Sequence, residues 1–521
     1  MPETTTTGDT TATPANAAAT PGAASDVRRQ VADNSRRRRT RKFAYLAAVI
    51  SLLIPIIVLG MPASEQNAAG DEADNGGVIA RQRHEFGLGE GTLGDIDPAS
   101  SSMNLMLLGL RGVAANQLWL EAVNQKDRKQ WNELEQTTNS IILLQPHFVQ
   151  VWRFGGWNMA YNVSAEFDAD EDRFAWVKKG AKFAKKGTDR NQLASELFHE
   201  RGDYVGNKIG HSDEWRQFRR FFITDPNEAL WDGGPDTDLN PDGIDNYLVA
   251  KQLYEQANEV DKMPNSIDQK KMADALFRAY APRSLYDMAM ARQKEGRLDD
   301  VTRDWWAKAY DEWVTKYGRE KFRQRGYEVQ LEMSPEEMAE AADDYGTTLD
   351  AFKASQNALM RMTNYSYWKL RGKVEGSPKM AEARRLLLEG KQHFLGLNDT
   401  GEQDFDLAEQ KLFRGLSLLE DILSITAADG GSLTEQETER SEQQADGDDA
   451  EYDANVREQF RREELLVKDI IKSQMMYRFI QQTMKGIDVE EAEVPLQDVW
   501  DSNPEIVAEV NVQFERRVGS D

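Results

Sequence analysis

The sequence predicts an all-α fold, an irregular solenoid of helical hairpins that follows one transmembrane helix and a disordered N-terminal tail. From Met103 onward, apolar residues recur at helical intervals, as at Leu107, Leu110 and Ala114. Short breaks rich in proline, glycine and aspartate separate these segments, and no convincing run of alternating β-branched residues occurs. The uncharged run from Phe43 to Met61, at about 1.5 Å per residue, is long enough to cross a bilayer as a helix.

This uncharged run organises the N-terminal part. Residues 1–42 are rich in Thr, Ala, Pro and Gly and end in a basic cluster, which predicts a disordered cytoplasmic tail. Residues 43–62 are the predicted transmembrane helix, and residues 63–102 a flexible stalk. Because arginines precede the run and residues 62–77 contain no Lys or Arg, we expect a single-pass protein with its bulk extracytoplasmic. A cleaved signal peptide is the alternative, but the long leader and the length of the run favour an uncleaved anchor.

The composition excludes several classes of function. The formal net charge of −25 at pH 7 argues against a nucleic-acid partner. The chain has no cysteine, and so no disulfide, thiolate metal site or cysteine nucleophile. None of the five histidines lies three or four residues from another, and the sequence contains neither a P-loop nor a G-x-S-x-G elbow. We therefore expect no enzyme activity, and no cofactor other than the calcium considered below.

The helical repeat domain is expected over residues 103–426. A proline or another turn residue marks most of the boundaries; Pro146, for example, ends a helix because the residue before a proline avoids the helical conformation. The predicted helices, in order, are Met103–Lys126, Gln130–Leu144, Val149–Asn162, Asp172–Lys186, Gln192–Gly206, Ser212–Phe222, Tyr247–Asn258, Ser266–Tyr280, Ser284–Glu295, Leu298–Lys316, Ser334–Ala341, Leu349–Leu370, Lys379–Leu397 and Leu407–Leu423.

Segments of this array resemble tetratricopeptide repeats, which are helical hairpins of about 34 residues. The clearest segment begins at Ser284, where Tyr286 takes the place of the early aromatic residue and Gly296 lies in the turn. Trp306 and Ala309 take the places of the second-helix aromatic residue and alanine. The resemblance implies a stack of helical hairpins whose usual activity is to bind protein or peptide partners.

Two further segments share this spacing in degenerate form. One begins at Val149, with Trp152 and Gly156 at the family's positions, and the other has Phe198 and Gly202. Insertions interrupt both segments. The resemblance covers residues 130–317 and, more loosely, residues 379–423.

The resemblance also implies a concave groove lined by the first helix of each hairpin. Tryptophan, tyrosine and arginine in such a groove have the chemistry of binding hot spots. The alternative is that these aromatic residues belong to the core, where tryptophan at helical spacing more often lies. The implied partner-binding residues are Arg153, Trp157, Tyr161, His199, Asp203 and Asp287.

The break between residues 232 and 245 is the best candidate for a metal site. Its alternating oxygen-bearing residues, followed by Gly243, reproduce the first half of a calcium loop. The second half fails, because Val249 stands where a bidentate acid is required, and a polar helix connection is the alternative. The possible calcium ligands are Asp236, Asp238, Asn240 and Asp242.

The C-terminal part divides into three stretches. Residues 427–454 are strongly acidic and predict a disordered linker. Residues 455–486 predict an amphipathic helix that either caps the solenoid or pairs with another chain, and residues 487–521 an acidic tail.

We therefore expect a membrane-anchored scaffold or adaptor whose exported helical domain binds protein or peptide partners. An enzyme with a carboxylate or metal site between helices is the first alternative. A calcium-stabilised structural module is the second.

Overall fold

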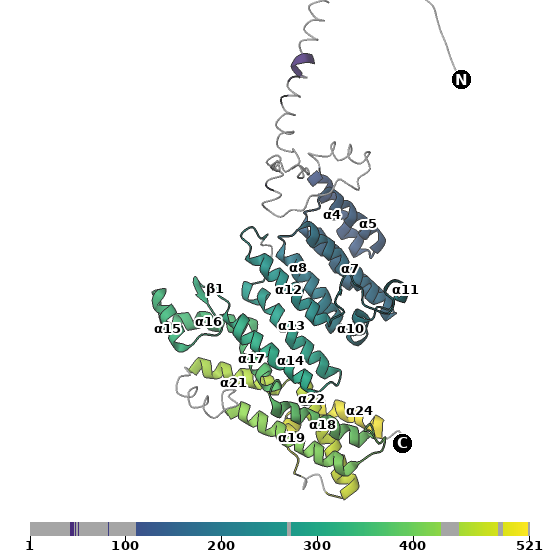
Figure 1. Cartoon of the computed structure of the whole chain (residues 1–521), viewed down its shortest axis with the longest axis vertical. Helices are drawn as coiled ribbons and strands as arrows, with labels where there is room; N and C mark the ends of the chain where they lie inside the picture. Colours follow the sequence, from purple (N-terminus) through teal and green to yellow (C-terminus); the bar gives the residue numbers. More distant parts are fainter. Residues whose placement is uncertain are drawn as a thin grey trace, which may run out of the picture. The chain divides into compact units, whose positions relative to one another are not determined.

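The computed structural model describes residues 42–45, 47, 51, 82, 111–267, 272–428, 447–487 and 493–518. The chain divides into two compact units, residues 1–87 and residues 88–521. Nearly all described residues belong to the second unit, which contains every helix labelled in Figure 1. The sections below therefore concern that unit.

Most of the predicted anchor lies outside the described residues. Of the predicted span, only residues 43–45, 47 and 51 are described, and the predicted tail and stalk contribute only residues 42 and 82. Among the described residues, no helix is long and apolar enough to cross a membrane. The anchor and its orientation stay predictions.

The all-α prediction is confirmed for the second unit. Its N-terminal elements are α4 (Arg111–Asp127), α5 (Trp131–Leu144), α6 (Val149–Trp157), η2 (Asn158–Val163), η3 (Ser164–Glu166), α7 (Asp170–Arg190), α8 (Ser195–Asp203), η4 (Tyr204–Lys208), α9 (Ile209–His211), α10 (Trp215–Ile223), α11 (Glu228–Trp231) and α12 (Asn246–Lys262). The elements η2 and η4 are π-helical turns that continue α6 and α8.

The remaining elements follow after residue 271. They are α13 (Asp274–Lys294), α14 (Asp300–Asp311), η5 (Glu312–Lys316), η6 (Tyr317–Arg319), β1 (Phe322–Gln324), β2 (Tyr327–Val329), α15 (Pro335–Asp344), α16 (Leu349–Thr363), α17 (Tyr365–Glu375), α18 (Pro378–Leu395), α19 (Phe405–Ala428), α21 (Gly447–Arg461), α22 (Glu464–Phe479), η7 (Ile480–Met484), α23 (Gln497–Ser502) and α24 (Pro504–Val518).

The helices stack mainly on their neighbours along the chain. Contacts join α4 to α5, α6 to α7, α8 to α12, α12 to α13, α13 to α14, α14 to α17 and α18 to α19 (Figure 1). One large core extends from α13 to α24, and smaller apolar clusters lie between the N-terminal helices. The structure therefore agrees with the general part of the prediction, an all-α array of packed helical hairpins.

Two glycines let α6 and α7 approach closely. A Cβ on Gly180 would lie 2.6 Å from the carbonyl oxygen of Gly156. A Cβ on Gly156 would lie 2.9 Å from the hydroxyl of Tyr204. Side chains at these positions would therefore push α6 away from both α7 and η4.

Predicted helix boundaries at Pro282 and within the helix Leu349–Leu370 were wrong. The structure continues α13 through Pro282, where the pattern predicted a break. Proline removes one backbone hydrogen bond at a cost of about 3 kcal/mol, but the complete burial of Leu285 and Tyr286 on the same helix outweighs that cost. Conversely, the predicted helix Leu349–Leu370 divides at Asn364, whose φ of +52° lies in the left-handed region.

The C-terminal stretch differs in a similar way. Residues 455–486, predicted as one helix, divide at Glu463, whose side chain accepts a hydrogen bond from the backbone N–H of Leu466 and so caps α22. Beyond them, α24 packs on α22, with Phe514 against Phe394 and Phe479 at ring distances of 5.8 Å. The capping interpretation fits these contacts. Of the predicted linker, residues 429–446 lie outside the described part.

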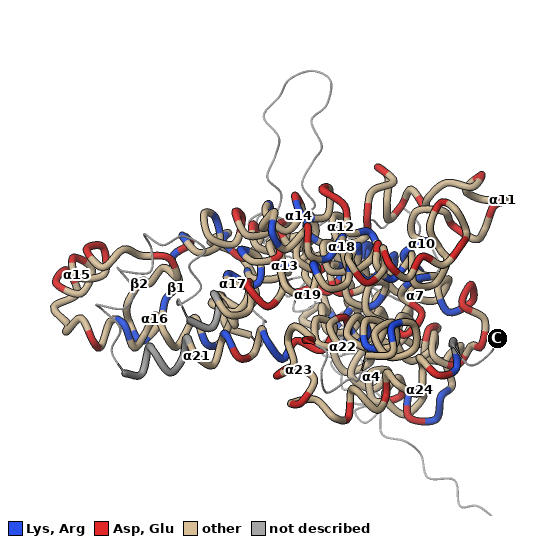
Figure 2. Tube along the Cα trace, turned by 90° about the horizontal axis from the view of Figure 1, so that it is seen from below, with Lys and Arg blue, Asp and Glu red and all other residues tan. Residues whose placement is uncertain are grey.

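The structure also contains one hairpin, β1–β2, which the sequence reading did not predict. Arg325 and Gly326 both have positive φ, as a two-residue hairpin turn requires. The strands are too short to give a recognisable alternation. Figure 2 shows acidic residues concentrated on the neighbouring helix α15, whereas both signs of charge are interspersed on most other helices.

Candidate functional site

A partly buried ion-pair cluster joins α6 to α8. The Nη1 of Arg153 lies 2.7 Å from Glu196 Oε1, and its Nε donates a short hydrogen bond to Glu200. The side chain of Arg153 is only 19% exposed and that of Glu200 17%. Burial raises the pKa of Glu200 from its ordinary 4.5 to about 7, although the positive charge of Arg153 acts in the opposite direction. The carboxyl of Glu200 therefore titrates near neutral pH.

This cluster continues through tyrosines on the two π-helical turns. Tyr161 lies in η2 and Tyr204 in η4, with their ring centroids 6.2 Å apart. Burial, reinforced by the negative charge of Asp203, raises the pKa of Tyr161. Asp203 accepts hydrogen bonds from the hydroxyl of Tyr254 at 2.7 Å and from Asn207 Nδ2 at 2.9 Å. π-Helical turns frequently occur at functional sites.

We call Arg153, Tyr161, Glu200, Asp203 and Tyr254 the polar track. Its members come from α6, η2, α8 and α12; α6 contacts η2 and α8, and α8 packs on α12, as Figure 1 shows for the last two helices. Their buried polar atoms interact with one another through the bonds and charges described above. The polar track is a connected network in which a change of charge at one member alters the others.

At one end of the polar track lies an exposed aromatic pair. Trp157 stacks on Tyr161 with a centroid separation of 3.9 Å, yet half of its surface, 50%, is exposed to solvent. The ammonium group of Lys208 lies 5.1 Å from the Tyr161 ring centroid. Trp157 is thus held in one orientation by its partner ring while its other face stays open.

At the other end of the polar track, a cavity of about 210 Å³ opens beside Tyr254. Its walls hold His211 and Asp287, whose Nε2 and Oδ1 atoms are 3.9 Å apart. Burial lowers the pKa of His211 and raises the pKa of Asp287, so burial favours the neutral form of each group. The residues that line the cavity are Gly206, Asn207, His211, Tyr247, Tyr254, Leu276, Ala279, Tyr280, Arg283, Ser284, Asp287 and Thr363.

The predicted groove residues divide between these features. Arg153, Tyr161 and Asp203 belong to the polar track, Trp157 to the exposed pair, and Asp287 to the cavity wall. His199 is only 3% exposed and lies among the rings of three aromatic residues, 4.5 to 4.8 Å from their centroids. His199 is therefore placed in the core, where it presents no surface to a partner.

The sequence reading missed several members of the site. Glu196 and Glu200 stand four residues apart on α8, a spacing that could have placed both acids on the side facing Arg153. Tyr254 and His211 gave no such signal, because their place in the site depends on packing between α8, α12 and α13.

The predicted calcium loop is occupied by lysines of α7. Asp236 Oδ2 lies 3.3 Å from the Lys178 ammonium and 2.8 Å from that of Lys182, which also contacts Asp238 at 2.8 Å. Burial acts to lower the pKa of Lys182, but its hydrogen bonds to the two aspartates outweigh burial and raise that pKa. The oxygen of Asn240 accepts from the backbone N–H of Ile244 at 3.0 Å. Lysine ammonium groups thus supply the positive charge that calcium would bring.

Across the described ranges, no three His, Cys, Asp or Glu residues come together in a way that could hold a metal ion. Asp242, the fourth predicted ligand, is exposed.

Comparison with protein-family models, with curated proteins and with solved structures finds no match for this chain. The structure supports a stack of helical hairpins. The assignment to the tetratricopeptide family stays a prediction.

Proposed function

We propose that this chain is a membrane-anchored scaffold or adaptor whose helical domain binds a protein or peptide partner at the Trp157 face. The observation that carries the proposal is Trp157 itself, a large aromatic residue that is half exposed and stacked on Tyr161. Tryptophan is among the residues that dominate binding energy at protein interfaces. A ring already fixed by stacking loses little conformational entropy when a partner covers it.

The polar track gives this face its specificity. The charges of this face act on Tyr161, on which Trp157 stacks: the carboxylate of Asp203 is 30% exposed and acts on the Tyr161 hydroxyl, and the ammonium of Lys208 lies over the Tyr161 ring. A partner with an apolar side chain for Trp157 and a donor for Asp203 would meet both requirements. Such a pattern of one apolar anchor surrounded by polar groups is typical of interface centres.

Affinity purification of the full chain from its source cells tests this function. The Trp157→Ala variant should lose the stoichiometric partner, whereas Leu143→Ala should retain it, because Leu143 is 69% exposed on α5 and lies outside the proposed face. Truncation of a hot-spot tryptophan costs about 2 kcal/mol or more, which corresponds to roughly thirtyfold in affinity. Equal recovery of the partner with both variants would contradict the assignment of this face.

An enzyme is the second candidate, and the His211–Asp287 pair favours it. A histidine and an aspartate whose pKa values are both shifted toward the neutral form, in a cavity that also holds Arg283 and three tyrosines, could transfer protons. Under this hypothesis Asp287→Asn abolishes turnover but leaves the partner bound at Trp157. Loss of partner binding with Asp287→Asn, without any substrate turnover in the unmodified chain, would count against the enzyme.

A further inference from the structure

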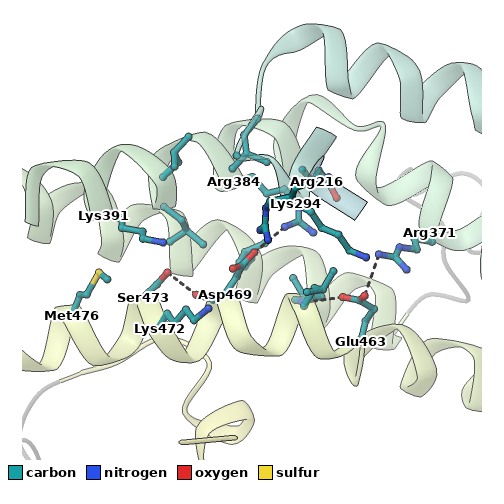
Figure 3. Close-up of a pocket in the computed structure, with 18 of the residues that line it drawn as sticks. Arg216, Lys294, Arg371, Arg384, Lys391, Glu463, Asp469, Lys472, Ser473 and Met476 are labelled. Carbon is teal, nitrogen blue, oxygen red and sulfur yellow. Dashed lines mark hydrogen bonds and ion pairs between the residues drawn. The ribbon is translucent and has the colours of Figure 1, made fainter. Parts of the chain in front are cut away.

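A second and larger cavity lies among α10, the end of α13, α17, α18, α19 and α22. Its volume is about 570 Å³, within the range of small-molecule sites. Figure 3 shows its labelled side chains arriving from several elements that are far apart in the sequence, with those of α22 along one wall. The proposed partner face and the polar track do not share residues with it.

Positive charge dominates this cavity. Its walls carry six cationic side chains against two carboxylates, those of Glu463 and Asp469, in a chain whose net charge is −25. The backbone N–H groups at the start of α22 add a positive potential at the same wall. The six cationic residues are Arg216, Lys294, Arg371, Arg384, Lys391 and Lys472.

Two of these cations are fixed by the protein itself. Arg384 donates to Glu375 from both Nε, at 2.8 Å, and Nη2, at 2.5 Å. Arg371 donates to the Tyr367 hydroxyl at 2.9 Å and to Glu463 at 3.3 Å. These buried guanidinium groups stiffen the wall, and their charges are largely neutralised by their partners.

Three of the other cations are more available to a ligand. Within the described part of the chain, Arg216, Lys294 and Lys472 have no carboxylate oxygen within 4.0 Å. Arg216 and Lys294 are exposed, and Figure 3 shows both directed toward the α22 wall. The cations of the lining outnumber its two carboxylates, so they repel one another, and an anion in the cavity would relieve that repulsion.

Apolar side chains form most of the remaining lining. The leucines come from four different segments, and Met476 closes one end. A ligand that fills this cavity therefore meets both cationic groups and hydrocarbon. The apolar lining residues are Trp215, Leu298, Leu387, Leu388, Leu419, Leu465, Leu466 and Met476.

We propose that this cavity binds a ligand that carries a phosphate group. A phosphate monoester bears a charge of about −1.5 to −2 at pH 7, and so can engage several cations within a small volume. Arginine and lysine are the residues that bind phosphate oxygens in proteins. A free phosphorylated compound and the headgroup of an anionic lipid share this chemistry; the apolar lining suits the lipid.

Titration of the purified full chain with three probes tests the proposal. The probes are pyrophosphate, monomeric dihexanoylphosphatidic acid and monomeric dihexanoylphosphatidylcholine, each followed by calorimetry at constant ionic strength. Phosphatidic acid should saturate one site, and its affinity should fall as salt is raised. Tighter binding of phosphatidic acid than of pyrophosphate identifies a lipid, and equal affinity identifies a free phosphorylated compound. Equal binding of the zwitterionic phosphatidylcholine would overturn the proposal.

Matched variants locate the binding. Arg216→Ala with Lys294→Ala should weaken phosphatidic acid about tenfold or more, because two cations that face the cavity are lost. Arg220→Ala with Lys308→Ala removes the same charge from α10 and α14 outside the lining, and should change the affinity less than twofold. Asp469→Asn should strengthen binding severalfold, since it removes a negative charge from the wall. No saturable binding, or equal weakening by the two double variants, would refute the site.

Discussion

Replacement of Glu200 by glutamine should remove a pH-dependent cost from the folded chain. The pKa of Glu200 is raised from 4.5 to about 7, so between these values the folded chain retains a proton that the unfolded chain has released. The stability that the protonated Glu200 carboxyl contributes is therefore fully present below pH 4.5 and is lost as the pH rises through 7. With its side chain 17% exposed, this shift corresponds to about 2.5 kcal/mol between pH 5 and pH 8.

Guanidinium unfolding of both chains at pH 5 and pH 8 measures this effect. The free energy of unfolding of Glu200→Gln minus that of the unmodified chain should be about 2.5 kcal/mol larger, that is, more stabilising, at pH 8 than at pH 5. Glu337→Gln serves as the control, because hydrogen bonds from the Ser334 backbone and Arg319 lower the pKa of Glu337 and confine its titration to acid pH. Equal pH dependence of Glu200→Gln and the unmodified chain would refute the buried ion-pair cluster.

Three further predictions follow from other parts of the molecule. Gly180→Ala should destabilise the fold by about 1 to 3 kcal/mol in denaturant unfolding, because its Cβ would press on Gly156 backbone; Gly112→Ala, whose Cβ meets nothing nearer than 3.6 Å, should not. Calcium should leave the melting temperature unchanged, since lysines already neutralise Asp236, and a rise reversed by chelator would instead support the calcium module. The chain should remain with membranes after carbonate washing, and a mature N-terminus after Met61 would show that the predicted anchor is cleaved.

The sequence predicted much of the local structure. Apolar periodicity located most helices of the second unit within a few residues, because an amphipathic helix buries one face wherever it packs. The resemblance to tetratricopeptide repeats, in turn, implied Arg153, Trp157 and Tyr161 as groove residues, and they stand four residues apart on the continuous helical segment formed by α6 and η2. The exposed pair formed by Trp157 and Tyr161 follows directly from that spacing.

The features that the sequence did not predict depend on contacts between residues far apart in the chain. The partners of Arg153 stand on α8, and the lysines that hold Asp236 stand on α7, at separations where no local pattern applies. Pro282 stayed helical because core burial outweighed its local preference. The cations of the 570 Å³ cavity come from α10, α13, α17, α18 and α22, so they gather only after these helices have packed together.

Site-specific photocrosslinking in the source cells tests the central claim of a partner-binding face most directly. A benzoylphenylalanine at position 157 should yield a discrete crosslinked protein. The same probe at position 143, a more exposed apolar site on α5, should yield none. Absence of a crosslink at position 157, or the same crosslinked products from both positions, would contradict the proposed function.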